Sequence, residues 1–139
     1  MIDHGKPMKE QIEALKLPPV ALVASLTFTD QHYKSIAEFM APQGKFGLID
    51  DPPEFTMSAF KGKAISVHWE SMFTRSSFQT ADMIAQHHLL GDVADLIDKG
   101  VLRTTLDQTF GTISAANLKR AHALLESGKS RGKIVLEGW

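Results

Sequence analysis

The stretch that decides the fold is "VALVASLTFTDQHYKSIAEFMAPQGKFGLID", residues 20–50. Its first part, residues 20–28, is apolar without alternation, which predicts a strand buried on both faces, as in a parallel sheet. Residues 29–44 repeat apolar side chains at helical spacing, and residues 45–50 form a second apolar run of strand length. A strand, a helix and a strand joined by short turns make a βαβ crossover, so the sequence predicts an α/β protein with a parallel sheet.

The flanking segments extend this pattern in both directions. A helix is predicted over residues 7–16, a third strand over "AISVHWE" (64–70), and a long helix over residues 80–99. Small polar residues just before apolar periodicity are typical helix N-caps. They predict Thr29 or Asp30 as the cap of the helix at 29–44, and Thr80 as the cap of the long helix.

The last forty residues change in character. Residues 103–111 are rich in β-forming residues, residues 114–128 form an amphipathic helix with Ser114 as its N-cap, and residues 133–138 form a last strand. The change near residue 102 predicts two domains, residues 1–101 and residues 102–139.

Composition excludes several classes of protein. The 139 residues carry a formal net charge of −1 with scattered Lys and Arg, so there is no electrostatic case for nucleic-acid binding. Cysteine is absent, which excludes disulfides and thiolate metal sites. The longest apolar run, Val20–Ala24, is too short for a membrane span, and no signal peptide opens the chain. We therefore expect no membrane association and a cytoplasmic location.

Residue patterns alone identify little chemistry. The sequence contains neither a Gly-rich dinucleotide fingerprint nor a "GxSxG" nucleophile motif, and "GKSRGK" (128–133) follows a helix instead of opening one. Ligands of open α/β sheets collect at the carboxyl ends of the strands, which draws attention to the loops at 25–27, 49–51 and 70–75. Asp50 and Asp51 are interpreted first as turn carboxylates before Pro52. His68, beside Trp69, is the histidine with the best case for a site role.

Several longer stretches resemble a known family. They are "VASLTFTDQHY" (23–33), "APQGKFGLIDDP" (41–52), "KAISVHWESMFTRSSFQTADMIAQH" (63–87), "LRTTLDQTFGTISAANLKRAHALLESG" (102–128) and "RGKIVLEGW" (131–139). Together they resemble the C-terminal portion of the medium-chain dehydrogenase/reductase superfamily, in its zinc-type alcohol dehydrogenase-like and quinone oxidoreductase-like branch. The resemblance covers essentially the whole chain.

This resemblance implies a definite architecture. In the family, a GroES-like catalytic domain precedes a six-stranded Rossmann sheet, and the chain then returns to complete the catalytic domain. The present chain would hold strands four to six of the Rossmann sheet and the β-α-β tail of the catalytic domain. It would be a fragment, inactive alone, because the glycine-rich loop that holds the cofactor pyrophosphate at a helix N-terminus is not in it.

The resemblance also implies cofactor-binding residues. The turn of Ser25, Leu26 and Thr27 would face the cofactor riboses. Ile49 and Asp50 would lie under the nicotinamide half. The remaining two are Phe73, near the carboxamide, and Lys133, which would reach the pyrophosphate.

The implied reaction is hydride transfer between NAD(P)H and a carbonyl, alcohol or quinone substrate. NADP is expected ahead of NAD, although the residues that read the 2′-phosphate lie elsewhere in the family. The metal ligands of the family belong to its N-terminal domain, so we expect no metal in this portion. No catalytic residue can be named.

The strand at 64–70 matches the one that pairs with its two-fold mate in this superfamily. We therefore expect a homodimer, with Val67 and Trp69 near its centre. Two alternatives stay open. One is a non-catalytic dimerisation or interaction module that reuses the fold, and the other is a small enzyme that uses His68 and Asp50 as acid and base.

Overall fold

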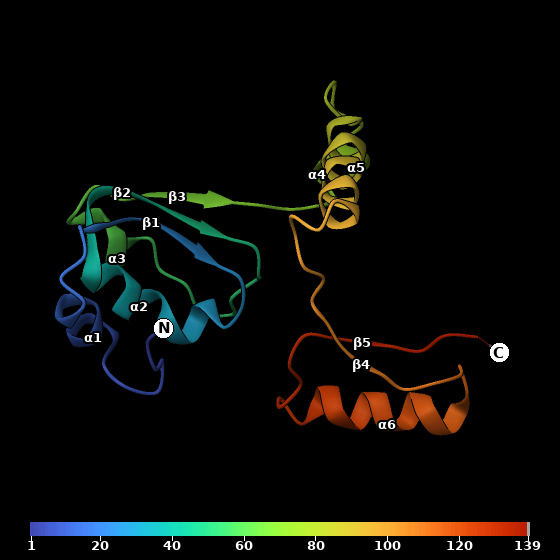
Figure 1. Ribbon diagram of the computed structural model, residues 1–139. Coiled ribbons are helices and arrows are strands. Elements are labelled where there is room, and N and C mark those ends of the chain that lie inside the picture. The colour runs from blue at the N-terminus through green and yellow to red at the C-terminus, as the bar shows by residue number, and fades with distance from the viewer. Residues whose placement is uncertain (139) are drawn as a thin grey trace. The chain divides into compact units, whose positions relative to one another are not determined.

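The computed structural model describes residues 1–138 (Figure 1), and the chain divides into two compact units, Met1–Thr80 and Ala81–Trp139. The first unit contains α1 (Met8–Ala14), β1 (Val20–Ser25), α2 (Thr29–Phe39), β2 (Met40–Leu48), α3 (Ser58–Lys61), β3 (Ser66–Trp69) and α4 (Thr74–Ser77). The second contains α5 (Ala85–Asp98), β4 (Leu106–Thr109), α6 (Ala115–Glu126) and β5 (Lys133–Val135). The predicted domain boundary between residues 101 and 102 stays a prediction.

The sheet of the first unit is parallel, as predicted. Its strands lie in the order β1-β2-β3, with Val23 opposite Phe46 and Phe46 opposite Val67. In Figure 1 the helices α1, α2 and α3 lie on one side of these strands. The βαβ crossover predicted for residues 20–50 is therefore confirmed.

The core of the first unit lies between α2 and this sheet. Tyr33, Ile36 and Ala37 recur at the helical spacing of three and four residues, and they are buried on the sheet side of α2. They pack against the wholly buried side chains of Phe46 and Leu48 on β2. The same periodicity that predicted the helix thus builds the core.

The prediction that β1 is buried on both faces is wrong. Only Ser25 of this strand is buried, and Leu22 is 72% exposed. Apolar side chains on a strand are covered only where another layer packs on them, and the helices of this unit lie on one face of the sheet. β1 also ends at Ser25, three residues before the predicted end, because Phe28 adopts a left-handed conformation (φ 53°) that an extended strand cannot contain.

The ends of α2 are stabilised by side chains from distant parts of the chain. The predicted cap at Thr29 or Asp30 is wrong, since the helix begins at Thr29 and its N-cap, Phe28, makes no side-chain hydrogen bond. The carboxylate of Asp50, 21 residues away, accepts the Thr29 N–H instead. At the other end, Lys63 donates through Nζ to the carbonyls of Ala37, Glu38 and Met40. A negative group at the N-terminus and a positive group at the C-terminus both match the helix dipole.

The second unit forms a parallel pair of strands joined through α6, as the predicted β-α-β tail requires. Ser114 is the N-cap of α6, as predicted, and its hydroxyl accepts the Asn117 N–H at 3.2 Å. The predicted cap at Thr80 is wrong. α5 begins only at Ala85, because residues 81–84 form turns before the helix starts.

Two short helices lie where the sequence predicted only loops, namely α3 and α4.

Among residues 1–138, no helix combines the length and the apolar character that crossing a membrane requires.

Candidate functional site at the carboxyl end of the sheet

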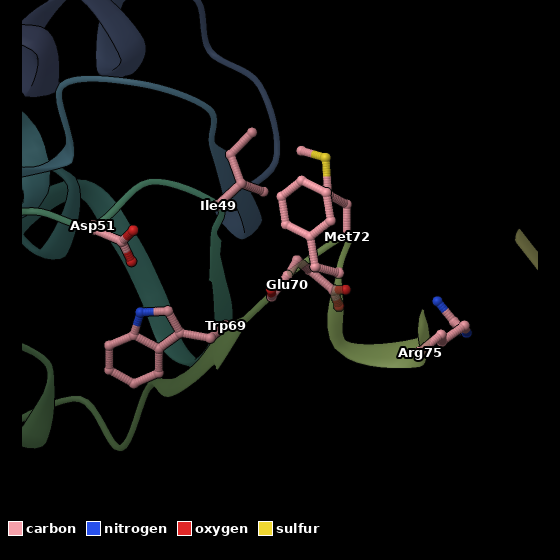
Figure 2. A pocket seen from close by; sticks show the side chains of 8 residues that line it. Ile49, Asp51, Trp69, Glu70, Met72 and Arg75 are labelled. Carbon is pink, nitrogen blue, oxygen red and sulfur yellow. The ribbon is translucent and has the colours of Figure 1, made fainter. Parts of the chain in front are cut away.

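A pocket of about 360 Å³ opens where β2 and β3 end (Figure 2). The Glu70 N–H donates to the Leu48 carbonyl at 2.9 Å, so the pairing of the two strands continues to the rim of the pocket. Its lining residues are Ile49, Asp51, Trp69, Glu70, Ser71, Met72, Phe73 and Arg75. Ligands of open parallel sheets bind at this end of the strands, and the volume lies in the range of small-molecule sites.

The pocket combines a large apolar wall with a few charged groups. Figure 2 shows Ile49 and Met72 rising on the same side of the pocket, with Asp51 and Arg75 at opposite ends. The indole of Trp69 makes an edge contact with Phe55, which packs against the core, with 5.9 Å between ring centroids. Flat apolar walls with charges at the margin suit a planar ring that carries polar substituents.

A chain of hydrogen bonds lies beside this pocket, at the ends of β1 and β2. The hydroxyls of Ser25 and Thr29 are 2.6 Å apart, and the Thr29 hydroxyl also donates to Asp50 Oδ1. The Thr29 N–H donates to Asp50 Oδ2 at 3.0 Å, and the Ile49 N–H donates to the Ser25 carbonyl at 3.3 Å. These contacts join the two strand-end loops at 25–29 and 49–50.

The hydrogen bonds keep Asp50 ionised. Burial raises the pKa of Asp50, but the hydrogen bonds from the hydroxyl and the N–H of Thr29 act in the opposite direction. The pKa of Asp50 is on balance held below its usual value, because these donors favour the charged form. Asp50 is therefore a carboxylate with a fixed position, and a poor candidate for an acid.

The predicted cofactor residues fall into three groups. Ile49 and Phe73 line the pocket. Leu26 and Thr27 are exposed in the loop after β1, whereas Ser25 is buried and bonded to Thr29. Lys133 is exposed on β5 in the second unit. Contact of any of these residues with a cofactor stays a prediction.

The adjacent aspartates have different surroundings. Asp50 bonds to Thr29, and the neighbouring Asp51, for which a turn role is the first interpretation, lines the pocket with Trp69 and Glu70. The rule for open parallel sheets pointed to the loops at 49–51 and 70–75, and every residue of the second loop except Thr74 lines the pocket. Nothing in "IDD" itself said which carboxylate would turn inward.

The structure does not bring His68 and Asp50 together. Val67 packs against the core under the sheet, and successive side chains of a strand point to opposite faces. His68 therefore lies on the face away from α2, where its Nε2 is 3.2 Å from the Ser66 hydroxyl. The carboxylate of Asp50 is on the side of α2, so these two residues form no acid–base pair.

Comparison with known proteins identifies the family. The family model described as "Zinc-binding dehydrogenase" matches residues 9–136. The chain belongs to the zinc-binding dehydrogenase family. This confirms the resemblance to zinc-type alcohol dehydrogenase-like proteins and the predicted fold class of a partial Rossmann-type sheet with a β-α-β tail.

Other members of the zinc-binding dehydrogenase family show how the chain relates to longer proteins. It is 31% identical over 137 residues to the zinc-type alcohol dehydrogenase-like protein of Staphylococcus aureus strain MSSA476, covering 98% of this chain and 41% of that protein. A solved structure of a candidate zinc-dependent alcohol dehydrogenase from Rhizobium etli CFN 42 is 54% identical, with a TM-score of 0.91 over 99% of this chain and 40% of the other. The chain thus spans about two-fifths of the length of these relatives.

A more distant structure shares the fold alone. The structure of an NAD-dependent alcohol dehydrogenase aligns over 99% of this chain with a TM-score of 0.71, at 16% identity. Similarity at that level of identity supports the topology of the zinc-binding dehydrogenase family and says nothing about a ligand of this chain.

The residues that the structure describes do not form a zinc site, although the family is named for zinc binding. Among residues 1–138, no group of three or more His, Cys, Asp or Glu side chains is arranged to hold a metal ion. Structural and catalytic zinc sites use at least three protein ligands, commonly Cys and His. We therefore assign no metal ligand here and derive no step through a metal.

Proposed function

We propose that this chain forms the nicotinamide side of the cofactor cleft of an NAD(P)(H)-dependent oxidoreductase. The observation that carries the proposal is the pocket at the carboxyl ends of β2 and β3, in a member of the zinc-binding dehydrogenase family. A dinucleotide cofactor bound there would supply hydride transfer. The substrate class that fits this chemistry is a carbonyl, an alcohol or a quinone.

The chain's own residues would bind and orient the cofactor. Ile49 and Phe73 provide apolar contacts for the planar ring, and Trp69 closes the pocket on the side of the core. The exposed Leu26 and Thr27 extend this surface along the end of the sheet towards the riboses. Lys133 supplies a positive charge for the pyrophosphate.

We expect binding without turnover from these 139 residues alone. The sequence contains no glycine-rich turn opening a helix, which is the element that matches the charge of the pyrophosphate. Only part of the binding free energy is then available, and no residue of this chain is assigned to substrate activation. NADP is the expected nucleotide, and the cytoplasm is the expected location.

Titration calorimetry with NADPH and NADH tests this proposal. We expect NADPH to bind with a Kd of roughly 0.1–1 mM, since ring contacts alone leave much of the usual affinity unrealised. Phe73→Ala should weaken binding at least about fivefold, because it removes one wall of the pocket. Phe78→Ala is the matched control, since Phe78 is 78% exposed and outside the pocket lining. No binding at several millimolar, or equal effects of the two variants, would contradict the proposal.

We further propose a homodimer formed through β3. This strand is last in the order β1-β2-β3, so its outer edge is unpaired within the described part of the chain. A free strand edge pairs readily with another chain, and an isologous antiparallel contact would place Val67 and Trp69 near the two-fold axis.

Sedimentation at several concentrations tests the dimer. His68→Glu places like charges near each other across the axis and should raise the dimer dissociation constant at least about tenfold. His4→Glu is the control, because His4 is an exposed turn residue of the same unit whose ring lies near His32 of α2 and which is not part of β3. A monomer at high concentration would overturn this part of the proposal. A dimer that binds neither nucleotide would favour the second candidate, a non-catalytic interaction module.

A further inference from the structure

Thr29 is the centre of a network of three polar side chains, those of Ser25, Thr29 and Asp50. Counting the protons of the two hydroxyl groups shows which group donates each hydrogen bond. The side chain of Thr29 is 0% exposed, and buried hydroxyls require hydrogen-bond partners. A threonine hydroxyl has one proton, and that proton goes to the Asp50 carboxylate. Ser25, whose hydroxyl oxygen lies 2.6 Å away, must then donate to Thr29. The network runs in one direction, from Ser25 through Thr29 to the charge on Asp50.

The network stabilises the loop at 26–28, which contains an unfavourable backbone conformation. Only three residues separate the end of β1 at Ser25 from the start of α2 at Thr29, and the last of them, Phe28, has φ 53°. A left-handed conformation is unfavourable for a bulky residue and persists only where its surroundings impose it. The residues on either side of this loop are Ser25 and Thr29, and their side chains carry the two hydroxyl groups of the network.

The network also joins two loops at the carboxyl end of the sheet. Thr29 holds Asp50 through two hydrogen bonds, one from its hydroxyl and one from its N–H. The neighbours of Asp50 on either side, Ile49 and Asp51, line the pocket. On the other side of the network, Leu26 and Phe28 are exposed at 65% and 58%. One buried hydroxyl therefore connects the exposed loop at 26–28 with the pocket residues at 49 and 51.

From this geometry we propose that Thr29 is a positioning residue for nucleotide binding, which holds the loops at 26–28 and 49–51 in a single arrangement without touching the ligand. This inference rests on the proposed function, which supplies the ligand. The effect of Thr29 on the two loops can be measured without a ligand. Pre-organised loops bind more tightly because they lose less freedom on association. Asp50 and Ser25 are the other two members of the same network, so their substitution should act in the same direction.

Two substitutions at Thr29 separate the hydroxyl from the packing. Thr29→Val keeps the shape and removes the hydroxyl, whereas Thr29→Ser keeps the hydroxyl and removes the methyl group. The matched control is Thr56→Val, since the Thr56 hydroxyl also pairs with a serine, Ser58, but at an exposed place outside both loops and without a bond to Asp50. Each full-length variant is measured by amide hydrogen exchange without ligand and by titration with NADPH.

We expect Thr29→Val to speed exchange of the Thr29 and Ile49 amides, which donate to Asp50 and to the Ser25 carbonyl, at least about tenfold relative to the core amides of β2. Its Kd for NADPH should rise about five- to tenfold, because the loops must then be ordered on binding. Thr29→Ser should stay within about twofold of the wild type in both measurements, and Thr56→Val should leave both unchanged.

Each contrary outcome has a definite meaning. Unchanged loop exchange in Thr29→Val, or equal losses in Thr29→Ser and Thr29→Val, would overturn the inference, since the hydroxyl would not be what holds the loops. Faster exchange with unchanged affinity would overturn the positioning role. If Thr29→Val does not fold, Asp50→Asn replaces it and must show the same selective exchange. Absence of NADPH binding to the wild type refutes the proposed function, and the exchange data still decide whether Thr29 holds the loops.

Discussion

Replacing Phe46 with alanine should lower the free energy of unfolding of the Met1–Thr80 unit by about 3–5 kcal/mol, the usual cost of a Phe-to-Ala change in a packed core. Phe46 is 0% exposed and lies on the middle strand of the sheet. Its ring stacks on Phe60, with 4.9 Å between centroids, and lies 6.3 Å from Phe55. The substitution opens a cavity between α2 and the sheet that neither neighbour can fill without leaving its own contacts.

The consequences should extend to the pocket. Phe55 contacts both Phe46 and Trp69, so loosening of the aromatic cluster frees the indole that forms one pocket wall. Urea unfolding followed by circular dichroism measures the stability. Phe78→Ala is the control, because a side chain that is 78% exposed should change stability by less than about 0.5 kcal/mol. A loss below about 1 kcal/mol for Phe46→Ala would mean that the core lies elsewhere.

The parts of the fold that could be predicted are those with a local signal. The spacing of Tyr33, Ile36 and Ala37 identified both α2 and its buried face. Ser114 could be recognised as an N-cap because the bond it makes, to the Asn117 N–H, lies within the same turn. Periodicity and local capping are properties of neighbouring residues, so one segment of sequence contains all the information that they require.

The parts that could not be predicted depend on partners far along the chain. Thr29 fits the sequence pattern of an N-cap, yet it is the first residue of the helix, and its N–H donates to the carboxylate of Asp50. At the other end of the same helix, the carbonyls accept hydrogen bonds from Lys63, which lies 23 to 26 residues further along the chain. The apolar character of β1 indicated two covering layers, but composition does not reveal whether a second layer is present on a given face. In both cases the deciding contact is tertiary.

The same reason limited prediction of the site. The rule that ligands bind at the carboxyl ends of parallel strands pointed to the loops at 49–51 and 70–75, which line the pocket. It could not assign Asp50 and Asp51, which are adjacent and chemically identical. What separates them is the hydrogen bonding from Thr29 to Asp50, and the buried position of Thr29 becomes visible only once α2 is placed on the sheet.

Replacing Gly132 with alanine should have the largest effect on the second unit, a loss of about 2–5 kcal/mol from the combined costs of a left-handed alanine and of overpacking. Gly132 has φ 65°, and an added Cβ would clash with the Thr105 carbonyl oxygen. That oxygen accepts the Lys133 N–H at 2.6 Å, a bond at the start of the pairing between β4 and β5. Relieving the clash therefore requires the two strands to separate where their pairing begins.

Gly128→Ala is a control that isolates the clash from the backbone cost. Gly128 has nearly the same conformation, φ 66°, but nothing lies within 4 Å of an added Cβ, so only about 1–2 kcal/mol should be lost. Amide exchange of Phe110 and Lys133, whose N–H groups donate across the strand pair to the carbonyls of Val135 and Thr105, measures the local stability directly. Gly132→Ala should abolish their protection because this unit has little buried core to compensate, with Ala121 the one buried residue of its described helices. Equal protection in the two alanine variants would show that the close approach of Gly132 to Thr105 does not hold the strands together.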